Sequence, residues 1–240
     1  MPLRAVFLDI GSTLLSIEPS RFTIYADAAT RRGRAIEPDA MRRAMGRAHH
    51  ALAAWHEGAF RYSDPWFRHF IERIFGAELG FDAAAVAEIT EELFERFEAP
   101  EHYRLFPGTR ALLRELRERG LVLGVISNWS ARLDRVLERL ELADAFDFVL
   151  ASAVEGVEKP DPAIFERALD RAGVAPADAL HAGDQPELDT RPARALGMRA
   201  VLVDHGASAD RPEAPTGDPG EGVPRVSTLA ELGAVILGAS

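Results

Sequence analysis

The sequence predicts an α/β fold, in which a parallel sheet is interrupted after its first strand by a block of helices. Residues 4–9 form a short apolar run without polar alternation, which is typical of a strand buried in a parallel sheet. From about residue 19 to residue 98, apolar side chains recur at helical spacing, and beyond residue 106 helical and strand-like segments alternate. The 240 residues are enough for a core domain with an inserted subdomain.

The block of helices is predicted from apolar stripes and helix-start signals. One helix is expected to bury a stripe with spacings of three and four, made by Met41, Met45, Ala48, Leu52 and Trp55. A second is expected to open at Ser63 or Asp64, because Pro65 then falls in its first turn. A third is expected to begin near Asp82. No strand is expected between these helices, so the block is interpreted as a small helical bundle.

The remainder of the chain is predicted to alternate between helices and strands. Strands are expected at residues 121–126, 148–151, 179–182 and 199–203, and helices at 130–140, 162–172 and 187–196. A helix ending at residue 119 precedes them, and the Pro- and Gly-rich residues 206–224 are expected to form a loop before a last short strand and helix. This alternation favours right-handed βαβ units and hence a Rossmann-like sheet. We expect a core of residues 1–15 and 104–240, and an inserted helical subdomain of residues 16–103.

The composition excludes several classes of protein. The chain is 47% hydrophobic and 28% charged, and it contains no apolar run near the ~18 residues of a membrane span. Residues at the N-terminus lack the layout of a signal peptide, so a cytoplasmic protein without a membrane partner is expected. The absence of cysteine excludes disulfides, thiolate metal ligands and a thiol nucleophile. A net charge of −10 argues against a nucleic-acid partner.

The basic residues show a strong bias. Of the 28 lysine and arginine residues, all but Lys159 are arginine. A sequence so strongly biased toward arginine retains a single ammonium group, so we expect a specific reason for Lys159.

Polar side chains gather where the predicted strands end. In open α/β sheets, ligands bind beyond the carboxyl ends of the strands. The side chains at or just beyond those ends are Asp9, Ser127, Asn128, Lys159, Asp184 and Asp189. The sequence therefore predicts that a hydroxyl, an ammonium and three acids converge on one edge of the sheet. His181, inside a predicted strand, is interpreted as a core residue.

Four segments in order, residues 9–14, 126–128, 158–162 and 183–189, resemble the four motifs of the haloacid dehalogenase superfamily. The resemblance covers nearly the whole chain, and the helical block resembles the cap that this family inserts after its first strand. Residues 126–133 and 146–149 are similar to the branch called haloacid dehalogenase-like hydrolase domain-containing protein 3.

The resemblance implies a role for each motif residue. Asp9 would attack phosphorus or carbon and form a covalent intermediate. Ser127, next to Asn128 in the second motif, would hold phosphoryl oxygens together with Lys159. Thr13 would fix the nucleophile loop by hydrogen bonding.

The resemblance also implies a cofactor, Mg²⁺. Asp184 would bind the ion together with Asp9 and the backbone carbonyl of Gly11, an oxygen-only ligand set that suits Mg²⁺. Asp189 would orient Lys159 or a metal-bound water from behind this set.

Gly11 departs from the pattern of the family's phosphatases, which usually carry a second aspartate at this position. That aspartate protonates the leaving group, and general acid–base help is worth ~10²–10⁴-fold in rate. The sequence therefore predicts slow turnover. Two reactions of the family are not expected: phosphonate hydrolysis needs a lysine in the cap, and sugar-phosphate mutases need the missing aspartate.

Three functions remain open from the sequence. The first is a magnesium-assisted phosphatase-like hydrolase acting on a small phosphorylated metabolite. The second is a metal-independent hydrolase of 2-haloacids, which would act on a halogenated substrate and tolerates a glycine at position 11. The third is a catalytically weakened protein that binds a phosphorylated ligand or a protein. The pair Asp184 and Asp189 favours the first, because two acids are costly to bring together without a cation. The sequence does not indicate an oligomeric state.

Overall fold

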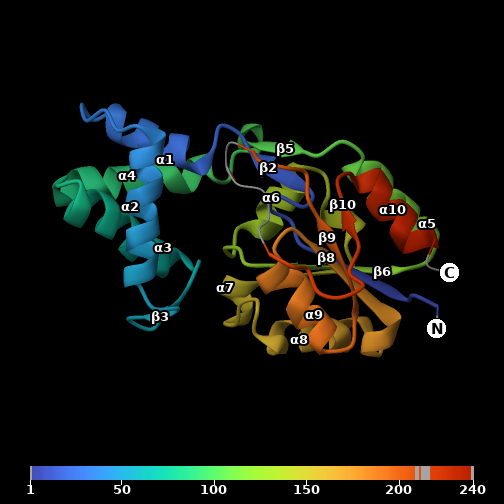
Figure 1. Ribbon diagram of the computed structural model, residues 1–240. Helices are drawn as coiled ribbons and strands as arrows, with labels where there is room; N and C mark the ends of the chain where they lie inside the picture. Colours follow the sequence, from blue (N-terminus) through green and yellow to red (C-terminus); the bar gives the residue numbers. More distant parts are fainter. Residues whose placement is uncertain (1, 209–210, 212–216, 239–240) are drawn as a thin grey trace.

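The computed structural model describes residues 2–208, 211 and 217–238. It consists of a sheet with helices on both faces and a separate group of helices to one side (Figure 1). The predicted α/β fold with a parallel sheet is confirmed. None of the helices in the described ranges is long and apolar enough to cross a membrane.

The main sheet has six parallel strands in the order β10-β9-β8-β1-β6-β7. Their bounds are β1 Ala5–Leu8, β6 Val122–Ser127, β7 Phe148–Ala151, β8 Ala179–Gly183, β9 Arg199–Val203 and β10 Arg225–Val226. The strand order changes direction at β1, with β6 and β7 on one side and the later strands on the other. This point, at the carboxyl end of β1, is where open α/β sheets bind ligands.

The register of the sheet brings the polar strand ends together. Leu8 of β1 lies opposite Val125 of β6 and Ala182 of β8. Because all three strands run in the same direction, the residues that follow these partners emerge at one edge.

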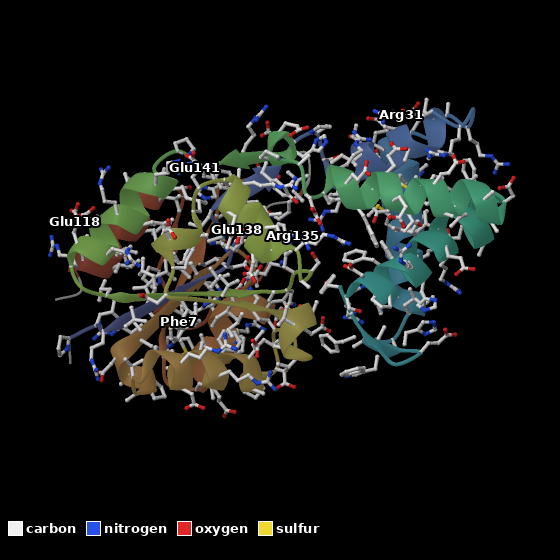
Figure 2. The ribbon with its side chains drawn as sticks, turned by 180° about the vertical axis from the view of Figure 1, so that it is seen from behind. Phe7, Arg31, Glu118, Arg135, Glu138 and Glu141 are labelled. Atoms are coloured by element: carbon white, nitrogen blue, oxygen red, sulfur yellow. The ribbon has the colours of Figure 1, made fainter. Side chains whose placement is uncertain are left out.

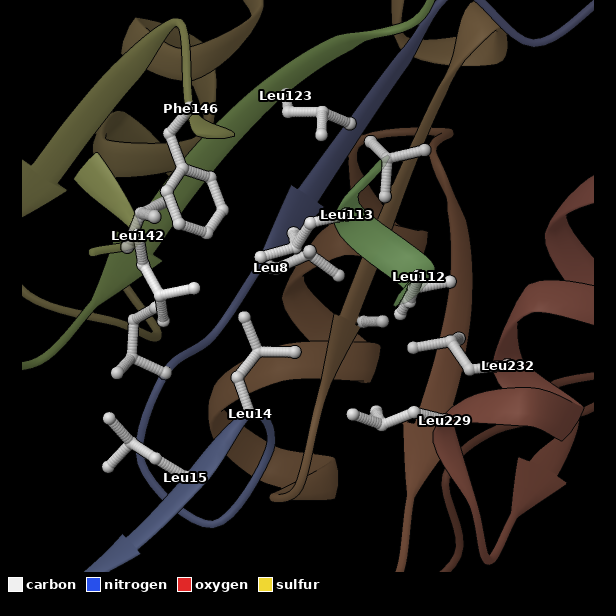
Figure 3. Close-up of a cluster of buried hydrophobic side chains, with 14 of the residues drawn as sticks. Leu8, Leu14, Leu15, Leu112, Leu113, Leu123, Leu142, Phe146, Leu229 and Leu232 are labelled. Carbon is white, nitrogen blue, oxygen red and sulfur yellow. The ribbon is translucent and has the colours of Figure 1, made fainter. Parts of the chain in front are cut away.

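Helices cover both faces of the sheet. They are α5 Thr109–Glu118, α6 Leu133–Arg139, α7 Ser152–Glu155, α8 Pro162–Ala172, α9 Arg191–Ala195 and α10 Leu229–Gly238. Successive side chains of β1 point to opposite faces. Leu8 packs with Leu112 of α5 and Leu232 of α10 in one core cluster (Figure 3). Phe7 faces the other way, toward α8 and α9 (Figure 2).

The inserted helices are α1 Arg21–Thr30, α2 Pro38–Ala51, α3 Asp64–Ile71 and α4 Ala83–Arg96. A π-helix, Glu72–Glu78, continues α3. The predicted helix starts are confirmed, because the Ser63 hydroxyl accepts a hydrogen bond from the Trp66 amide and the Asp82 carboxylate accepts one from the Ala85 amide. The helices share a hydrophobic cluster of their own, separate from the two clusters that sandwich the sheet. This cluster includes Met41, Trp66, Phe70, Phe75, Ile89 and Leu93.

The prediction that no strand lies between these helices is wrong. A hairpin of β3 Trp55–His56 and β4 Ala59–Phe60 joins α2 to α3. Helix α2 stops because Leu52 adopts an extended conformation, so Trp55 no longer continues the apolar stripe. Its side chain is 61% exposed instead of belonging to the core.

The chain leaves the sheet and returns to it along two paired strands. Strand β2 (Leu15–Ile17) pairs in antiparallel fashion with β5 (Tyr103–Leu105). The Thr109 hydroxyl donates a hydrogen bond to the Leu14 carbonyl at 2.9 Å, beside this ribbon. Both connections between the sheet and the inserted helices therefore run side by side.

Ion pairs join the inserted helices to the sheet part of the molecule. Arg132, just before α6, contacts Asp64 at 2.7 Å and Glu98 at 2.9 Å. Arg135, labelled on the side of α6 in Figure 2, also contacts Glu98 at 3.0 Å.

Candidate active site

The carboxyl ends of β1, β6 and β8 place three polar side chains at the same edge of the sheet. Asp9 directly follows β1, and its backbone amide donates to the carbonyl of Ala182 in β8 at 2.9 Å. Ser127 is the last residue of β6, and Asp184 directly follows β8. All three are buried. The convergence predicted from the strand ends is therefore present.

Lys159 lies at the centre of this group. Its Nζ donates hydrogen bonds to Asp9 Oδ1 at 2.9 Å and to Asp189 Oδ1 at 2.5 Å, and the side chain is only 3% exposed. Burial alone would lower the pKa of Lys159, but the two carboxylates, Asp189 first, outweigh it and raise the pKa. The only ammonium side chain of the protein is thus held charged between two acids.

Asn128 acts on Lys159 through the backbone. Its Nδ2 donates to the Lys159 carbonyl at 3.0 Å, and its Oδ1 accepts from the Lys159 amide at 2.8 Å. These two bonds attach the lysine-bearing loop to the end of β6. Asn128 is therefore a positioning residue for the ammonium group.

Asp189 is fixed from several directions. Besides Lys159, His181 Nε2 lies 3.0 Å from Asp189 Oδ1, and the Gln185 amide donates to Oδ2 at 2.9 Å. Burial would raise the pKa of Asp189, but Lys159 and His181 overcome this effect and lower it. Because the ionised carboxylate can only accept, the His181 proton resides on Nε2. Gly183 is required here, since a Cβ at that position would overlap the Asp189 carboxyl group.

Of the three acids in the site, Asp184 has the negative charge that is least compensated by neighbouring positive groups. Burial, followed by the charges of Asp9 and Asp189, raises its pKa to about 7. Its Oδ2 accepts a hydrogen bond from the Arg211 guanidinium, while Oδ1 is buried without a partner among the described residues.

The three carboxylates form a cluster suited to a cation. Asp9, Asp184 and Asp189 each offer an oxygen, and these oxygens lie within 4.8 Å of one another. The orphaned Asp184 Oδ1 and the oxygen-only donor set both fit a hard cation such as Mg²⁺. Asp189 thus places a third carboxylate beside Asp9 and Asp184, the two acids predicted as metal ligands.

Gly11, the departure in the first motif, faces an aromatic ring. A Cβ built at Gly11 would lie 3.2 Å from Cζ3 of Trp129. Trp129 follows the second motif and is half-buried. An acid side chain at position 11 would therefore require this ring to move.

Thr13 does not play the predicted hydrogen-bonding role through its hydroxyl. The Oγ1 atom is buried and has no partner among the described residues. The loop is held instead through the Thr13 carbonyl, which lies 3.0 Å from His205 Nε2, and by backbone bonds to the Ile10 carbonyl.

A family model of the haloacid dehalogenase-like hydrolases matches residues 3–197 of this sequence. The chain belongs to this family. It is similar to the haloacid dehalogenase-like hydrolase domain-containing protein 3 of Bos taurus, with 37% identity over 207 residues that cover 85% of this chain and 82% of that protein. The predicted resemblance to that branch is confirmed.

Relatives named as phosphatases are also found. A phosphoserine phosphatase of Thermus thermophilus is 41% identical over 163 residues, which cover 64% of this chain and 65% of that protein. A solved structure of a HAD (haloacid dehalogenase) phosphatase from Thermococcus onnurineus is 27% identical, covers 98% of both chains and has a TM-score of 0.68. The chain is thus a hydrolase of a family with phosphatase members.

Sequence reasoning missed three residues of the site. His181 is buried in the core as predicted, but its hydrogen bond to Asp189 is not predicted, although a fully buried histidine signals such a partner. Trp129 lies within residues 126–133, which carry the family resemblance, but the sequence assigns no role to its side chain. Arg211 lies in a segment interpreted only as a loop, and no local pattern directs its side chain to Asp184.

Proposed function

We propose that this chain is a phosphatase-like hydrolase that acts on a small phosphorylated metabolite, with Asp9 as nucleophile and Mg²⁺ as cofactor. The observation that carries the proposal is the position of the Lys159 ammonium between Asp9 and Asp189, beside the partly uncompensated carboxylate of Asp184. This arrangement combines a buried nucleophile with a nearby ammonium group. It also includes a further carboxylate whose negative charge is not fully compensated.

In the proposed reaction the Asp9 carboxylate attacks phosphorus, the bond from phosphorus to the ester oxygen breaks, and an aspartyl-phosphate forms. Water then attacks the phosphorus, releases inorganic phosphate and restores the carboxylate. Lys159 and the Ser127 hydroxyl bind phosphoryl oxygens and offset their charge. Asn128 and Asp189 hold the ammonium in position.

Asp9 and Asp184, with the Gly11 carbonyl, would hold Mg²⁺, and Asp189 lies near enough to contribute an oxygen. The bound ion would neutralise phosphoryl charge and bring the substrate to the nucleophile. Arg211 contacts Asp184 Oδ2, so its positive charge would lie beside the ion, while Oδ1 has no partner among the described residues.

Gly11 limits the range of good substrates. Without an acid near the leaving group, the departing oxygen must leave as an anion or take its proton from water. We therefore infer that acyl and aryl phosphates, whose leaving groups are weakly basic, react faster than alkyl phosphates. The family relationship to phosphatases supports phosphorus rather than carbon as the reacting centre.

The inserted residues 16–103 are proposed to act as the cap that selects the substrate. A cavity of about 420 Å³ lies where the two parts meet, with Trp55 and Phe60 on one wall and Val157, Glu158 and Pro160 on the other. Arg61 bridges the parts at this point, because its Nη1 contacts Glu158 Oε1 at 2.7 Å. Glu158 directly precedes Lys159.

The test is a panel of acyl, aryl and alkyl phosphates, assayed for phosphate release in Mg²⁺ and in EDTA. We expect Mg²⁺-dependent release that Asp9→Asn and Asp184→Asn abolish, whereas Asp170→Asn, an exposed acid on α8, leaves it unchanged. Halide release from 2-haloacids in EDTA that Asp9→Asn abolishes would instead establish the dehalogenase alternative. Ligand binding without any turnover would establish the binding-protein alternative.

A further inference from the structure

A second group of side chains that could bind a metal lies in the inserted part of the chain, away from the acid cluster. His56 and Glu57 belong to the β3–β4 hairpin, and His69 belongs to the last turn of α3. One ligand atom from each lies within 4.8 Å of the other two. The group contains two imidazoles and one carboxylate, a different donor set from the three carboxylates of the candidate active site.

The distance between Glu57 and His69 and the arrangement of the two imidazole rings match those of ligands around a tetrahedral ion. His69 Nε2 lies 3.5 Å from Glu57 Oε2. Two ligand atoms at about 2.05 Å from a tetrahedral zinc ion would be about 3.3 Å apart. The rings of His56 and His69 are 5.0 Å apart at 83°. Two imidazoles on one tetrahedral ion would have ring centres about 5 Å apart, given the same bond length.

The hairpin turn presents Glu57 in an uncommon backbone conformation. Glu57 and Gly58 both have positive φ, 47° and 78°, which is the geometry of a type I′ turn. Asparagine, aspartate and glycine are the residues preferred in such turns, whereas glutamate is not. The longer glutamate side chain reaches His69, and it is 69% exposed, so a metal can enter from solvent.

The donor types select the ion. Two imidazole nitrogens and a carboxylate suit zinc and similar transition ions, while Mg²⁺ prefers oxygen ligands and retains its waters. We propose that His56, Glu57 and His69 bind a zinc ion that fastens the β3–β4 hairpin to α3. With three protein ligands, a fourth position remains for water or another ligand.

The hairpin connects this site to the cavity between the two parts of the molecule. Trp55 and Phe60, which pair across the hairpin, line that cavity, and Arg61 bridges to Glu158 directly after it. A zinc ion on the hairpin therefore rigidifies one wall of that cavity. The zinc site does not depend on the proposed function, because its ligands and preferred ion differ from those of the acid cluster.

The experiment uses the full-length protein, stripped of metal by a chelator, in the Asp184→Asn background so that the acid cluster is impaired. Zn²⁺ binding is measured by calorimetry in excess Mg²⁺, and Co²⁺ is added as a spectroscopic probe, because tetrahedral Co²⁺ absorbs visible light more strongly than octahedral Co²⁺. We expect one Zn²⁺ per chain and an intense Co²⁺ spectrum that Zn²⁺ abolishes. Both His56→Ala and His69→Ala should weaken Zn²⁺ binding at least about tenfold.

Two further variants keep the test decisive. His50→Ala removes an exposed histidine of α2 that lies outside the group, and it should leave Zn²⁺ affinity unchanged. Glu57→Gln changes an exposed side chain, so it should weaken binding without unfolding the chain, as checked by circular dichroism of the metal-free protein. Equal Zn²⁺ affinity in the parent, His56→Ala and Glu57→Gln proteins would overturn the proposal, as would the absence of Zn²⁺ binding in the parent.

Discussion

Replacing Lys159 by methionine tests the charge arrangement on which the candidate site depends. Methionine retains much of the apolar stem and removes the ammonium that contacts Asp9 and Asp189. Both acids then remain buried without their shared cation. Removal of one partner from a buried ion pair costs about 3–5 kcal/mol. For a chain of this size, that loss lowers Tm by about 6–20 °C.

The pH dependence of this loss has a defined sign. In the parent protein the pKa of Asp189 is lowered, so its contribution to stability is present above the ordinary pKa of 3.8 and is lost as the pH falls through the folded-state pKa. In Lys159→Met the lysine no longer lowers this pKa, so that burial, which raises the pKa, is opposed only by His181. The folded variant therefore takes up protons as the pH falls from neutral. The deficit in stability should be largest near pH 7.5 and should narrow toward about pH 4.5.

Urea unfolding followed by circular dichroism measures this deficit across the pH range, without Mg²⁺. Lys159→Arg is the control that retains the charge, and its broader guanidinium fork should fit the two acids poorly, giving an intermediate loss. A deficit for Lys159→Met below about 1 kcal/mol, or one that is constant with pH, would refute the reasoning, because breaking a buried charge pair costs more than that.

Three other predictions concern the cation and the missing acid. Mg²⁺ at a hundred times its Kd should stabilise the protein by about 2.7 kcal/mol. The gain should shrink below pH 7, where Asp184 binds a proton instead, and it should be lost in Asp184→Asn, as melting curves will report. Arg211→Ala should increase Mg²⁺ affinity several-fold in calorimetry, since its guanidinium occupies Asp184 Oδ2; unchanged affinity would contradict competition. Gly11→Asp combined with Trp129→Ala, which makes room for the new side chain, should increase phosphatase kcat by ~10²–10⁴-fold. Gly11→Asp alone should give a smaller increase. Equal rates in the single and double variants would show that the ring is no obstacle.

Much of the sheet could be predicted because its strands are buried on both faces. The apolar runs at β7 and β9 have the same bounds in the sequence and in the structure. The short strands β2 and β5 were missed, because each has only three residues and its partner lies across the whole insertion. Trp55 was misplaced for a different reason: its spacing from Leu52 suits a helix, but periodicity does not reveal where the backbone turns extended.

The strand-end rule found the acids and the lysine of the candidate site because topology alone gathers them. Asp9, Ser127 and Asp184 lie at the ends of strands that are neighbours in the sheet, so their convergence needed no knowledge of side-chain conformation. The position of Arg211 could not be predicted in this way, because Arg211 itself does not follow a strand of the sheet. The ring of Trp129 beside Gly11 is likewise a tertiary contact that a residue pattern does not encode.

Because β2 and β5 pair with each other, the inserted helices could be removed from the chain without breaking the path of the sheet. Ile17 and Tyr103 are opposite each other in antiparallel register, where Cα atoms lie about 4.5–5.5 Å apart. A two-residue Asn-Gly turn spans that gap, so residues 18–102 could be excised and the ribbon closed into an ordinary β-hairpin. Conversely, a hairpin tip at this position in an ancestral chain could accept a helical module. Such an insertion, or a later exchange of the module, would not disturb the strands that hold the reacting groups.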